Sequence, residues 1–274
     1  MELVTGEQIL AERCVVSGLN PHQTFLELLP DDAVPAWLRS RVEGFQYNLL
    51  APLFALHVAL KEPPAYFHAR EHPEVASAFM TILGLDRFQQ FHEIVAAHER
   101  GEFPATVAWG ACPSLFDPSQ APPGKHVAFL WEKLPYALRG HPRHWREAQA
   151  ERGRHLLTFW REFASNLSGE VVLDSFTQSP ADIEQALPNM ARGDLLVGSF
   201  ANDQVGYHRP FPGAGQYRTP IPGLYLCGGS THPGGNVTGL CGYNAARVIA
   251  ADCQARIWWN PPNIEEVLSG QLRV

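Results

Sequence analysis

Residues 223–246 read Gly-Leu-Tyr-Leu-Cys-Gly-Gly-Ser-Thr-His-Pro-Gly-Gly-Asn-Val-Thr-Gly-Leu-Cys-Gly-Tyr-Asn-Ala-Ala, and this stretch decides which fold we expect. Its beginning, Leu224 to Cys227, is a short apolar run bounded by Gly223 and by paired glycines, which is typical of a buried strand. From Val237 onward, apolar residues recur at helical spacing, so a helix is expected to begin near Thr238. The stretch therefore predicts a strand, a glycine-rich loop and a helix, in that order.

A loop of this kind has a physical use. Glycines allow backbone N–H groups to approach a ligand closely, and the positive end of a helix dipole favours negative charge. A pyrophosphate carries such charge, as does the N1–C2=O edge of a reduced flavin. The residues alone leave two interpretations open: a cradle for a cofactor, or a glycine-rich corner that only turns the chain.

The stretch from Pro222 to Ala246 resembles the C-terminal flavin-binding signature of the phytoene desaturase family of FAD-dependent oxidoreductases, in the form found in its phytoene dehydrogenase-related branch. The family includes carotenoid desaturases and isomerases and retinol saturase. Residues 14–21, residues 113–118 with 121–126, and residues 209–210 with 217–220 also resemble the family, in the expected order. The resemblance therefore covers nearly the whole chain.

Family members are usually about twice as long and open with a strand, a G-x-G-x-x-G turn and a helix that hold the FAD pyrophosphate. This sequence contains no such fingerprint, because Gly6 and Gly18 stand apart. The chain thus resembles a C-terminal half, which implies a partner polypeptide carrying the N-terminal FAD-binding half. A truncated chain and a paralogue that has lost flavin are the other open explanations, and the initiating Met1 favours a natural subunit.

The resemblance implies an α/β fold class. It combines an α+β substrate domain, with a mixed sheet and helices, and the C-terminal portion of a Rossmann-like FAD-binding domain that lacks its G-x-G-x-x-G half. Residues 1–43 would be a partial FAD-binding segment and residues 44–178 the substrate-binding domain. Residues 179–274 would return to the FAD-binding domain, with the flavin motif and a tail.

Apolar spacing, caps and turn residues predict the individual elements. Strands are expected at residues 13–16, within 45–60, and at 106–112, 126–134 and 171–176. Helices are expected at 21–29, 35–42, 142–167 and 180–187, as two amphipathic segments in 71–99 that break at Gly84, and as a short helix after Pro262. Residues 198–217 have no period and predict an ordered loop or a lid.

The resemblance also assigns cofactor-binding residues: Ser17, Gly18, Gly228, Gly229, Ser230, Gly234, Gly235, Val237, Thr238, Gly239 and Leu240. Residues 228–230 would lie near the ribityl chain or pyrophosphate, and residues 237–240 would present helix N–H groups to the flavin's pyrimidine edge. Many related flavoproteins have an Asp in this loop, which is absent here. Because the G-x-G-x-x-G fingerprint is absent, we expect the chain alone to bind FAD weakly or not at all. From the loop glycines, we expect Gly228→Val to remove flavin from the assembled complex while leaving the fold intact.

Four polar residues are candidates for chemistry or substrate contact. His232 lies inside the motif and is the candidate catalytic proton donor or acceptor, or it only shapes the loop. Arg209 is suited to a bidentate contact with a cofactor phosphate or a substrate carboxylate, or to an ion pair with an acid of its loop. His57, on the opposite strand face from Phe54, lines a pocket or is solvated, and residues 231–236, including Asn236, would face the substrate.

Composition excludes several classes of partner. The net charge is −7 and no run of Lys or Arg is present, so nucleic acid is not an expected partner. Five cysteines without a C-x-x-C motif or a secretory leader predict reduced thiols and a cytoplasmic protein.

The longest apolar stretch, residues 49–60, is too short to span a bilayer, which is compatible with peripheral membrane contact. No metal is expected, because the pairs His68/His72 and His141/His144 lack a third ligand at motif spacing.

Two functional hypotheses follow. The first is part of an FAD-dependent oxidoreductase that acts on C–C or C=C bonds of an apolar small molecule, by hydride transfer or redox-neutral isomerisation, and is completed by a partner. The second is a flavin-free binding or scaffold subunit of a larger complex.

Overall fold

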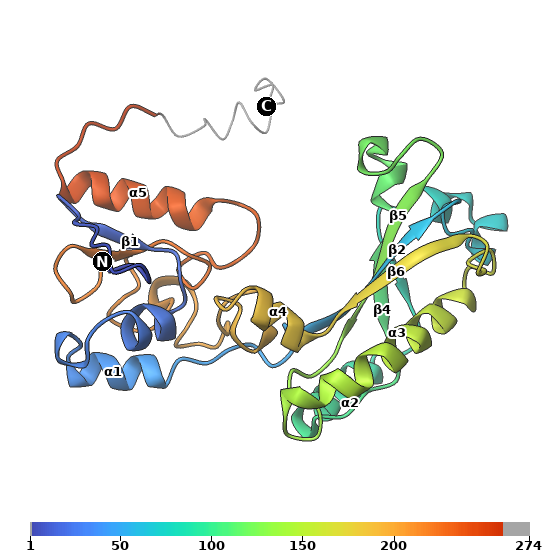
Figure 1. Ribbon diagram of the computed structural model, residues 1–274, viewed down its shortest axis with the longest axis horizontal. Coiled ribbons are helices and arrows are strands. Elements are labelled where there is room, and N and C mark those ends of the chain that lie inside the picture. The colour runs from blue at the N-terminus through green and yellow to red at the C-terminus, as the bar shows by residue number, and fades with distance from the viewer. Residues whose placement is uncertain (1, 260–274) are drawn as a thin grey trace. The chain divides into compact units, whose positions relative to one another are not determined.

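The computed structural model describes residues 2–259, which combine helices and strands in two units (Figure 1). The first unit is made of residues up to 45 and from 200 onward, and the second of Gln46–Ser199. The described residues are thus mixed α/β, as the sequence predicts.

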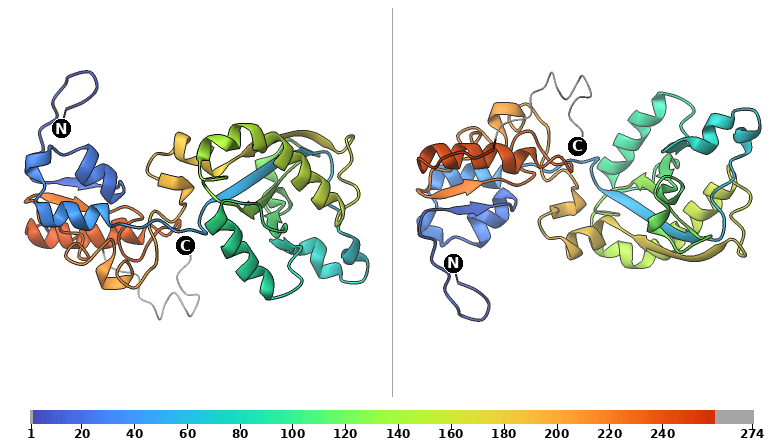
Figure 2. Two further views of the ribbon diagram at one scale, coloured as in Figure 1. Left: turned by 90° about the horizontal axis from the view of Figure 1, so that it is seen from below. Right: turned by 90° about the horizontal axis from the view of Figure 1, so that it is seen from above.

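The first unit is built on two parallel strands, β1 (Val15–Ser17) and β7 (Leu224–Leu226), with Val16 opposite Tyr225. Helix α5 (Leu240–Asp252) covers one face of this pair. The π-helical turn η1 (Gln23–Glu27) and helix α1 (Ala36–Glu43) lie on the other face (Figures 1 and 2). Phe25, Leu38 and Leu226 are buried between these layers because they carry the apolar faces of η1, α1 and β7.

The second unit is built on a five-stranded antiparallel sheet in the order β3-β4-β5-β2-β6. Its strands are β2 (Leu53–Leu60), β3 (Thr81–Leu83), β4 (Ala108–Ala111), β5 (His126–Lys133) and β6 (Val172–Gln178). Helices α2 (Gln89–Arg100) and α3 (Trp145–Arg161) lie along one face (Figure 1). Helix α4 (Pro180–Ala186) follows β6.

The core of the second unit lies between the sheet and α3. Alternate residues of β2, among them Phe54 and Leu56, are buried there against Trp145 and Trp160. The rings of Phe54 and Trp145 stack with centroids 5.6 Å apart. The intervening residue His57 consequently points to the other face of the sheet.

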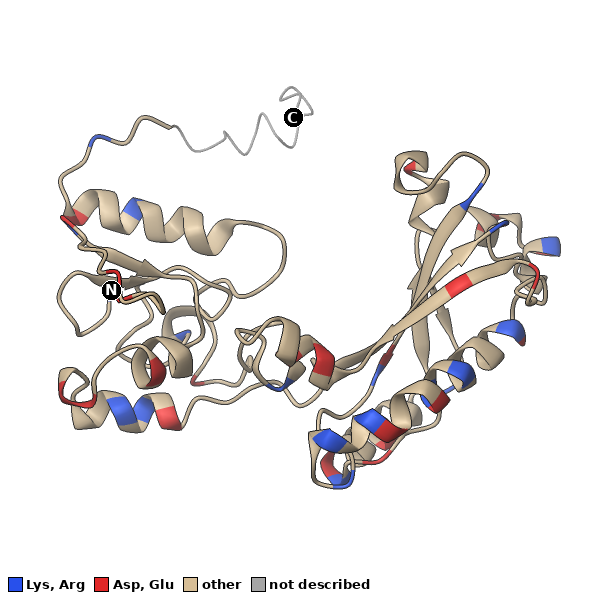
Figure 3. Ribbon diagram, viewed as in Figure 1, with Lys and Arg blue, Asp and Glu red and all other residues tan. Residues whose placement is uncertain are grey.

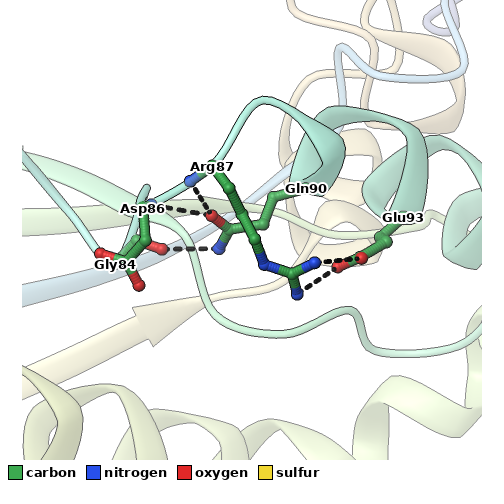
Figure 4. A network of polar contacts seen from close by, with 5 residues as sticks. All are labelled: Gly84, Asp86, Arg87, Gln90 and Glu93. Atoms are coloured by element: carbon green, nitrogen blue, oxygen red, sulfur yellow. Dashed lines mark hydrogen bonds and ion pairs between the residues drawn. The ribbon is translucent and has the colours of Figure 1, made fainter.

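Short helical turns connect these elements. They are η2 (Asp31–Ala33), η3 (Phe67–Arg70), η4 (Pro73–Ser77), η5 (Pro113–Leu115), η6 (Pro118–Gln120), η7 (Pro142–His144), η8 (Ala191–Gly193) and η9 (Gly206–His208). Where the chain enters α2, the buried Gln90 side chain accepts from the N–H groups of Asp86 and Arg87 and donates to Gly84 O (Figure 4). Gln90 thereby fixes the turn between β3 and α2.

Several predicted elements are confirmed with shifted ends. The helix at Pro180 has the predicted Ser179 cap, as a capping box with Asp182. The strand expected within residues 45–60 begins only at Leu53, and the helix expected at 142–167 is α3, preceded by the turn η7. The terminal helix begins at Leu240 instead of Thr238, because Gly239 is in the left-handed conformation. The short helix expected after Pro262 lies outside the described residues.

The first of the two helices expected in residues 71–99 is wrong. Residues 73–77 form only a 3-10 turn, and Thr81–Leu83 form the edge strand β3, paired with β4. Ile82, which helical spacing would place on the apolar face of that helix, is 62% exposed. Pairing with a strand distant in sequence has overridden the local helical spacing.

A buried ion pair links β5 to α3. Arg152 donates to both carboxylate oxygens of Glu132, through Nε at 2.9 Å and through Nη2, and Nη2 also donates to Thr106 Oγ1 at 3.0 Å. Both charged side chains are buried. Burial raises the pKa of Glu132 to about 7, although the Arg152 cation offsets part of this rise.

This raised pKa predicts a pH-dependent stability. Between pH 4.5 and about 7 the folded chain retains a proton on Glu132 that the unfolded chain releases, so the contribution is present at low pH and is lost as pH rises through about 7. We expect the free energy of unfolding to fall between about pH 5 and 8 more steeply in the parent protein than in Glu132→Gln. Urea unfolding at both pH values measures this, and equal slopes in the two proteins would contradict it.

Candidate functional site

The ends of β1 and β7 lie directly against each other at two glycines. The N–H of Cys227 donates to Ser17 O at 2.8 Å, and Gly228 follows beside the backbone of Gly18. A Cβ atom at position 228 would lie 2.0 Å from Gly18 O, far inside contact distance. Glycine is therefore required at position 228 by the chain itself, and the expectation that Gly228→Val leaves the fold intact is wrong.

The first half of the glycine-rich loop is turned inward and fixed. Both the N–H and the hydroxyl of Thr231 donate to Gly228 O, at 2.9 and 2.8 Å. The Sγ of Cys241 lies 3.2 Å from Gly234 O and 3.5 Å from Thr231 O. The buried hydroxyl of Ser230 has no hydrogen-bond partner among the described residues, and such an atom is costly in a folded protein.

The second half of the loop is open. Asn236, Val237, Thr238 and Gly239 are exposed, and Asn236 has a positive φ of 118°. Helix α5 then begins with no side chain capping it from position 239. Thr238 Oγ1 accepts from the N–H of Leu240, whereas the next two N–H groups, of Cys241 and Gly242, have no hydrogen-bond partner among the described residues. An exposed helix start of this kind favours negative charge.

Two further glycines in this region have no steric requirement within the described chain. A Cβ at Gly18 would meet only Cys227 Sγ, at 3.8 Å, and a Cβ at Gly242 would meet nothing within 4 Å. Gly242 lies in the first turn of α5, where alanine would favour the helix. Gly242 was not among the expected site residues, because helical spacing alone does not distinguish this glycine from the other small residues of the helix.

His232 and Asn236 lie on the exposed part of the loop. The backbone carbonyl of His232 accepts from the hydroxyl of Tyr217 at 2.9 Å, which fixes the loop to the end of the 198–217 segment. Ser17 lies at the other side of the strand ends, where its hydroxyl is 2.7 Å from that of Thr24. The structure thus brings the expected residues of 17–18 and 228–240 into the first unit, around one end of β1 and β7.

Arg209 is completely buried in the first unit. Its guanidinium donates to Gly229 O from Nε and Nη2, at 3.3 and 2.9 Å, and to Gln204 O from Nη1 at 3.2 Å. The guanidinium carbon lies 4.5 Å from the centre of the Phe200 ring. Arg209 therefore joins the 198–217 segment to the glycine-rich loop through backbone carbonyls.

His57 lies in the second unit, on the face of the sheet opposite α3. It stacks on Phe176 with ring centroids 5.2 Å apart and lies 6.3 Å from Phe129, which in turn stacks on Trp131 at 4.3 Å. His57, Phe129 and Phe176 line a cavity of about 530 Å³, with Asp174, Ser175 and Gln120 among its polar neighbours. Burial lowers the pKa of the His57 imidazole, because desolvation disfavours its charged form.

The aromatic row on this face was not predicted. Phe129 and Trp131 alternate with buried residues in β5, but only the register that places His57 opposite Phe129 and Phe176 shows that the rings adjoin. Trp109 and Trp131, further along the face, pack against the buried cluster of Leu53, Ala55 and Ile183. The open part of the face is therefore the part that carries His57.

Two expectations concern metals and membranes. Within residues 2–259 no group of three or more His, Cys, Asp or Glu side chains is placed to hold a metal ion. A search of the same residues for a helix of sufficient length and apolarity to cross a bilayer finds none.

The chain is similar over most of its length to proteins named as oxidoreductases. It is 32% identical to a limonene dehydrogenase subunit of Castellaniella defragrans, over 80% of this chain and 40% of that protein. It is 30% and 28% identical to pyridine nucleotide-disulfide oxidoreductase domain-containing protein 2 of Mus musculus and Rattus norvegicus, over 91% of this chain and 43% of each relative. The chain thus spans less than half the length of these relatives. No family model matches it.

Among solved structures, a Methanosarcina mazei oxidoreductase aligns with 86% of this chain and 42% of its own, at 16% identity and a TM-score of 0.43. The names of the relatives found by sequence support a relationship to oxidoreductases, one of them a subunit, and do not single out phytoene desaturases.

Proposed function

We propose that this chain is part of an FAD-dependent oxidoreductase and that its first unit holds part of the flavin. The observation that carries the proposal is the open start of α5, where the N–H groups of Cys241 and Gly242 have no hydrogen-bond partner among the described residues. Negative charge is favoured at such a helix start, and the pyrimidine edge of a reduced flavin supplies it.

The residues present fit this cofactor in two further respects. The Ser230 hydroxyl is buried and has no hydrogen-bond partner among the described residues, so it has a donor and acceptor to offer a polar ligand. Gly18, just after β1, and Gly242, in the first turn of α5, add no side chain at these two positions, where a Cβ would find space. Residues 17–18 and 228–230 would hold the ribityl or pyrophosphate part, and residues 234–242 the ring. When bound, FAD supplies the hydride chemistry.

The second unit would provide the surface for the substrate. Its open sheet face is apolar and aromatic around His57, Phe129 and Phe176, which suits an apolar small molecule that needs few hydrogen bonds. Limonene, in the name of one relative, is an apolar hydrocarbon with C=C bonds. We accordingly propose that residues 46–199 bind the substrate. The proposed reaction class is the desaturation, saturation or isomerisation of C–C and C=C bonds.

A partner polypeptide would complete the cofactor site. The chain has no G-x-G-x-x-G fingerprint and spans 40–43% of its relatives, one of which is itself named as a subunit. The partner would supply the strand, turn and helix that hold the FAD pyrophosphate. His232 is the candidate proton donor or acceptor of the loop, and Asn236 is the proposed residue that faces the substrate. Arg209, whose buried guanidinium donates to Gly229 O and Gln204 O, would instead hold the loop in shape.

Substitution of Gly242 tests the proposal. Gly242→Ala and Gly242→Leu should leave the chain folded, since a Cβ meets nothing there, and alanine should stabilise it by about 0.5–1 kcal/mol. The flavin content of the purified assembly should fall with side-chain size, about tenfold for leucine. Gly169→Ala, at an equally open glycine in the second unit, is the control. Full flavin content in an intact Gly242→Leu assembly would argue against a flavin at α5.

A further inference from the structure

Strand β1 has one paired edge and one open edge. The N–H of Val15 donates to Gly223 O, and Ser17 O accepts from Cys227 N–H, both at 2.8 Å. Alternate residues of a strand direct their backbone groups to opposite edges. The N–H and C=O of Val16 therefore point away from β7, and they have no partner among the described residues.

The far edge of β7 is already occupied. The N–H of Leu226 donates to Tyr217 O at 2.8 Å, and the N–H of Thr219 donates to Leu224 O at 3.3 Å. Arg218 forms an isolated antiparallel bridge with Tyr225 at this edge. Any strand that extends this sheet must consequently add beside β1.

The side chains of β1 are those of an interior strand. Val15 and Val16 point to opposite faces, yet both are apolar, and they remain 47% and 43% exposed. Parallel strands covered by helices on both faces are normally buried on both faces and apolar throughout. The neighbouring helix α5 has one basic and one acidic side chain in 13 residues (Figure 3).

We infer that a parallel strand of the partner polypeptide adds to the free edge of β1, so that Val16 becomes an interior position of a larger sheet. This inference rests on the proposed function, which requires that partner. The relatives are more than twice as long as this chain, so the part of them that the chain does not match is long enough to contain a further strand. A second copy fits less well, because a two-fold axis would pair the three-residue strands in antiparallel fashion.

The proposed pairing has a consequence for the cofactor site. A strand parallel to β1 would end beside Ser17 and Gly18, on the same side as the glycine-rich loop. In open α/β sheets, ligands bind outside the carboxyl ends of the strands. The partner would thus deliver its own loop to the place where residues 17–18 and 228–230 meet.

The test is hydrogen–deuterium exchange resolved to the Val16 amide, in the assembly purified from the protein's own source and in the separated chain. We expect the amide to exchange freely in the separated chain and at least about a hundredfold more slowly in the assembly. Val16→Pro removes the outward N–H but none that β7 uses, so it should weaken association about tenfold or more. Val16→Ile keeps the N–H and should associate within about threefold of the parent chain.

The outcomes separate this inference from the function on which it rests. Fast exchange of Val16 in a flavin-containing two-chain assembly, or unchanged association of Val16→Pro, would overturn the edge pairing and leave the proposed function standing. A symmetric dimer of this chain in which the Val16 amide is protected would overturn pairing with a partner polypeptide and would favour pairing with a second copy. A flavin-free assembly in which the Val16 amide is protected would support the edge pairing and contradict the proposed flavin binding. If Val16→Pro fails to fold, the exchange of the unaltered protein still decides.

Discussion

Gly228→Ala is expected to unfold the first unit. The new methyl group would lie 2.0 Å from the oxygen and 2.6 Å from the carbonyl carbon of Gly18. Both neighbours are backbone, which cannot rotate away as a side chain can, so β1 and β7 would have to separate at the point where Cys227 bonds to Ser17. We expect a loss of about 3 kcal/mol or more, at the upper end for overpacking.

Gly18→Ala is the matched control at the same pair of strand ends. Its methyl group would meet only the Sγ of Cys227, at an ordinary 3.8 Å, so the free energy of unfolding should change by less than about 1 kcal/mol. Chemical unfolding of both variants, followed by circular dichroism, measures the difference. Equal stability of the two variants would show that the strand ends do not meet as described.

Arg209→Met is expected to cost about 2 to 3 kcal/mol of the free energy of unfolding. The substitution keeps most of the apolar volume but removes the donors to Gly229 O and Gln204 O, and buried carbonyl groups without donors are costly. It also removes the cation above the Phe200 ring. The segment 200–217 should become more sensitive to proteases, because the arginine fixes it to the glycine-rich loop.

Arg218→Met provides the control for this prediction. Arg218 lies nine positions away in the same unit but is half exposed, and it pairs with Asp252 at the surface. Surface pairs typically contribute about 1 kcal/mol or less, so this variant should unfold closer to the parent protein than Arg209→Met does. An Arg209→Met variant as stable as Arg218→Met would mean that the buried guanidinium does not hold the loop. Arg209→Lys should recover little, since a lysine cannot form the same planar fork.

Local patterns were sufficient for part of the fold. The alternation in 53–60 gave β2 because every second residue packs on α3, and Ser179 with Asp182 marked the start of α4 because a capping box is a short-range motif. The strand β3 could not be found in this way. Its residues have helical spacing, and only pairing with β4, more than twenty residues later, makes them a strand.

The candidate site, like the fold, was only partly predictable from local sequence patterns. The glycine-rich loop and the helix after it were predicted from residue types, because a change of period and clustered glycines are visible in a sequence. The contact between Gly18 and Gly228 was not, since it joins residues 210 positions apart. Nor does the sequence show that Arg209 is buried against backbone carbonyls, or that His57 adjoins Phe129 and Phe176 across three strands.

The most direct test of the central claim is native mass spectrometry, with a visible spectrum, of the assembly purified untagged from its own source. The account predicts this chain together with a second polypeptide and bound FAD, with the two absorption bands of an oxidised flavin. A colourless single species would contradict it and would favour the flavin-free binding or scaffold role.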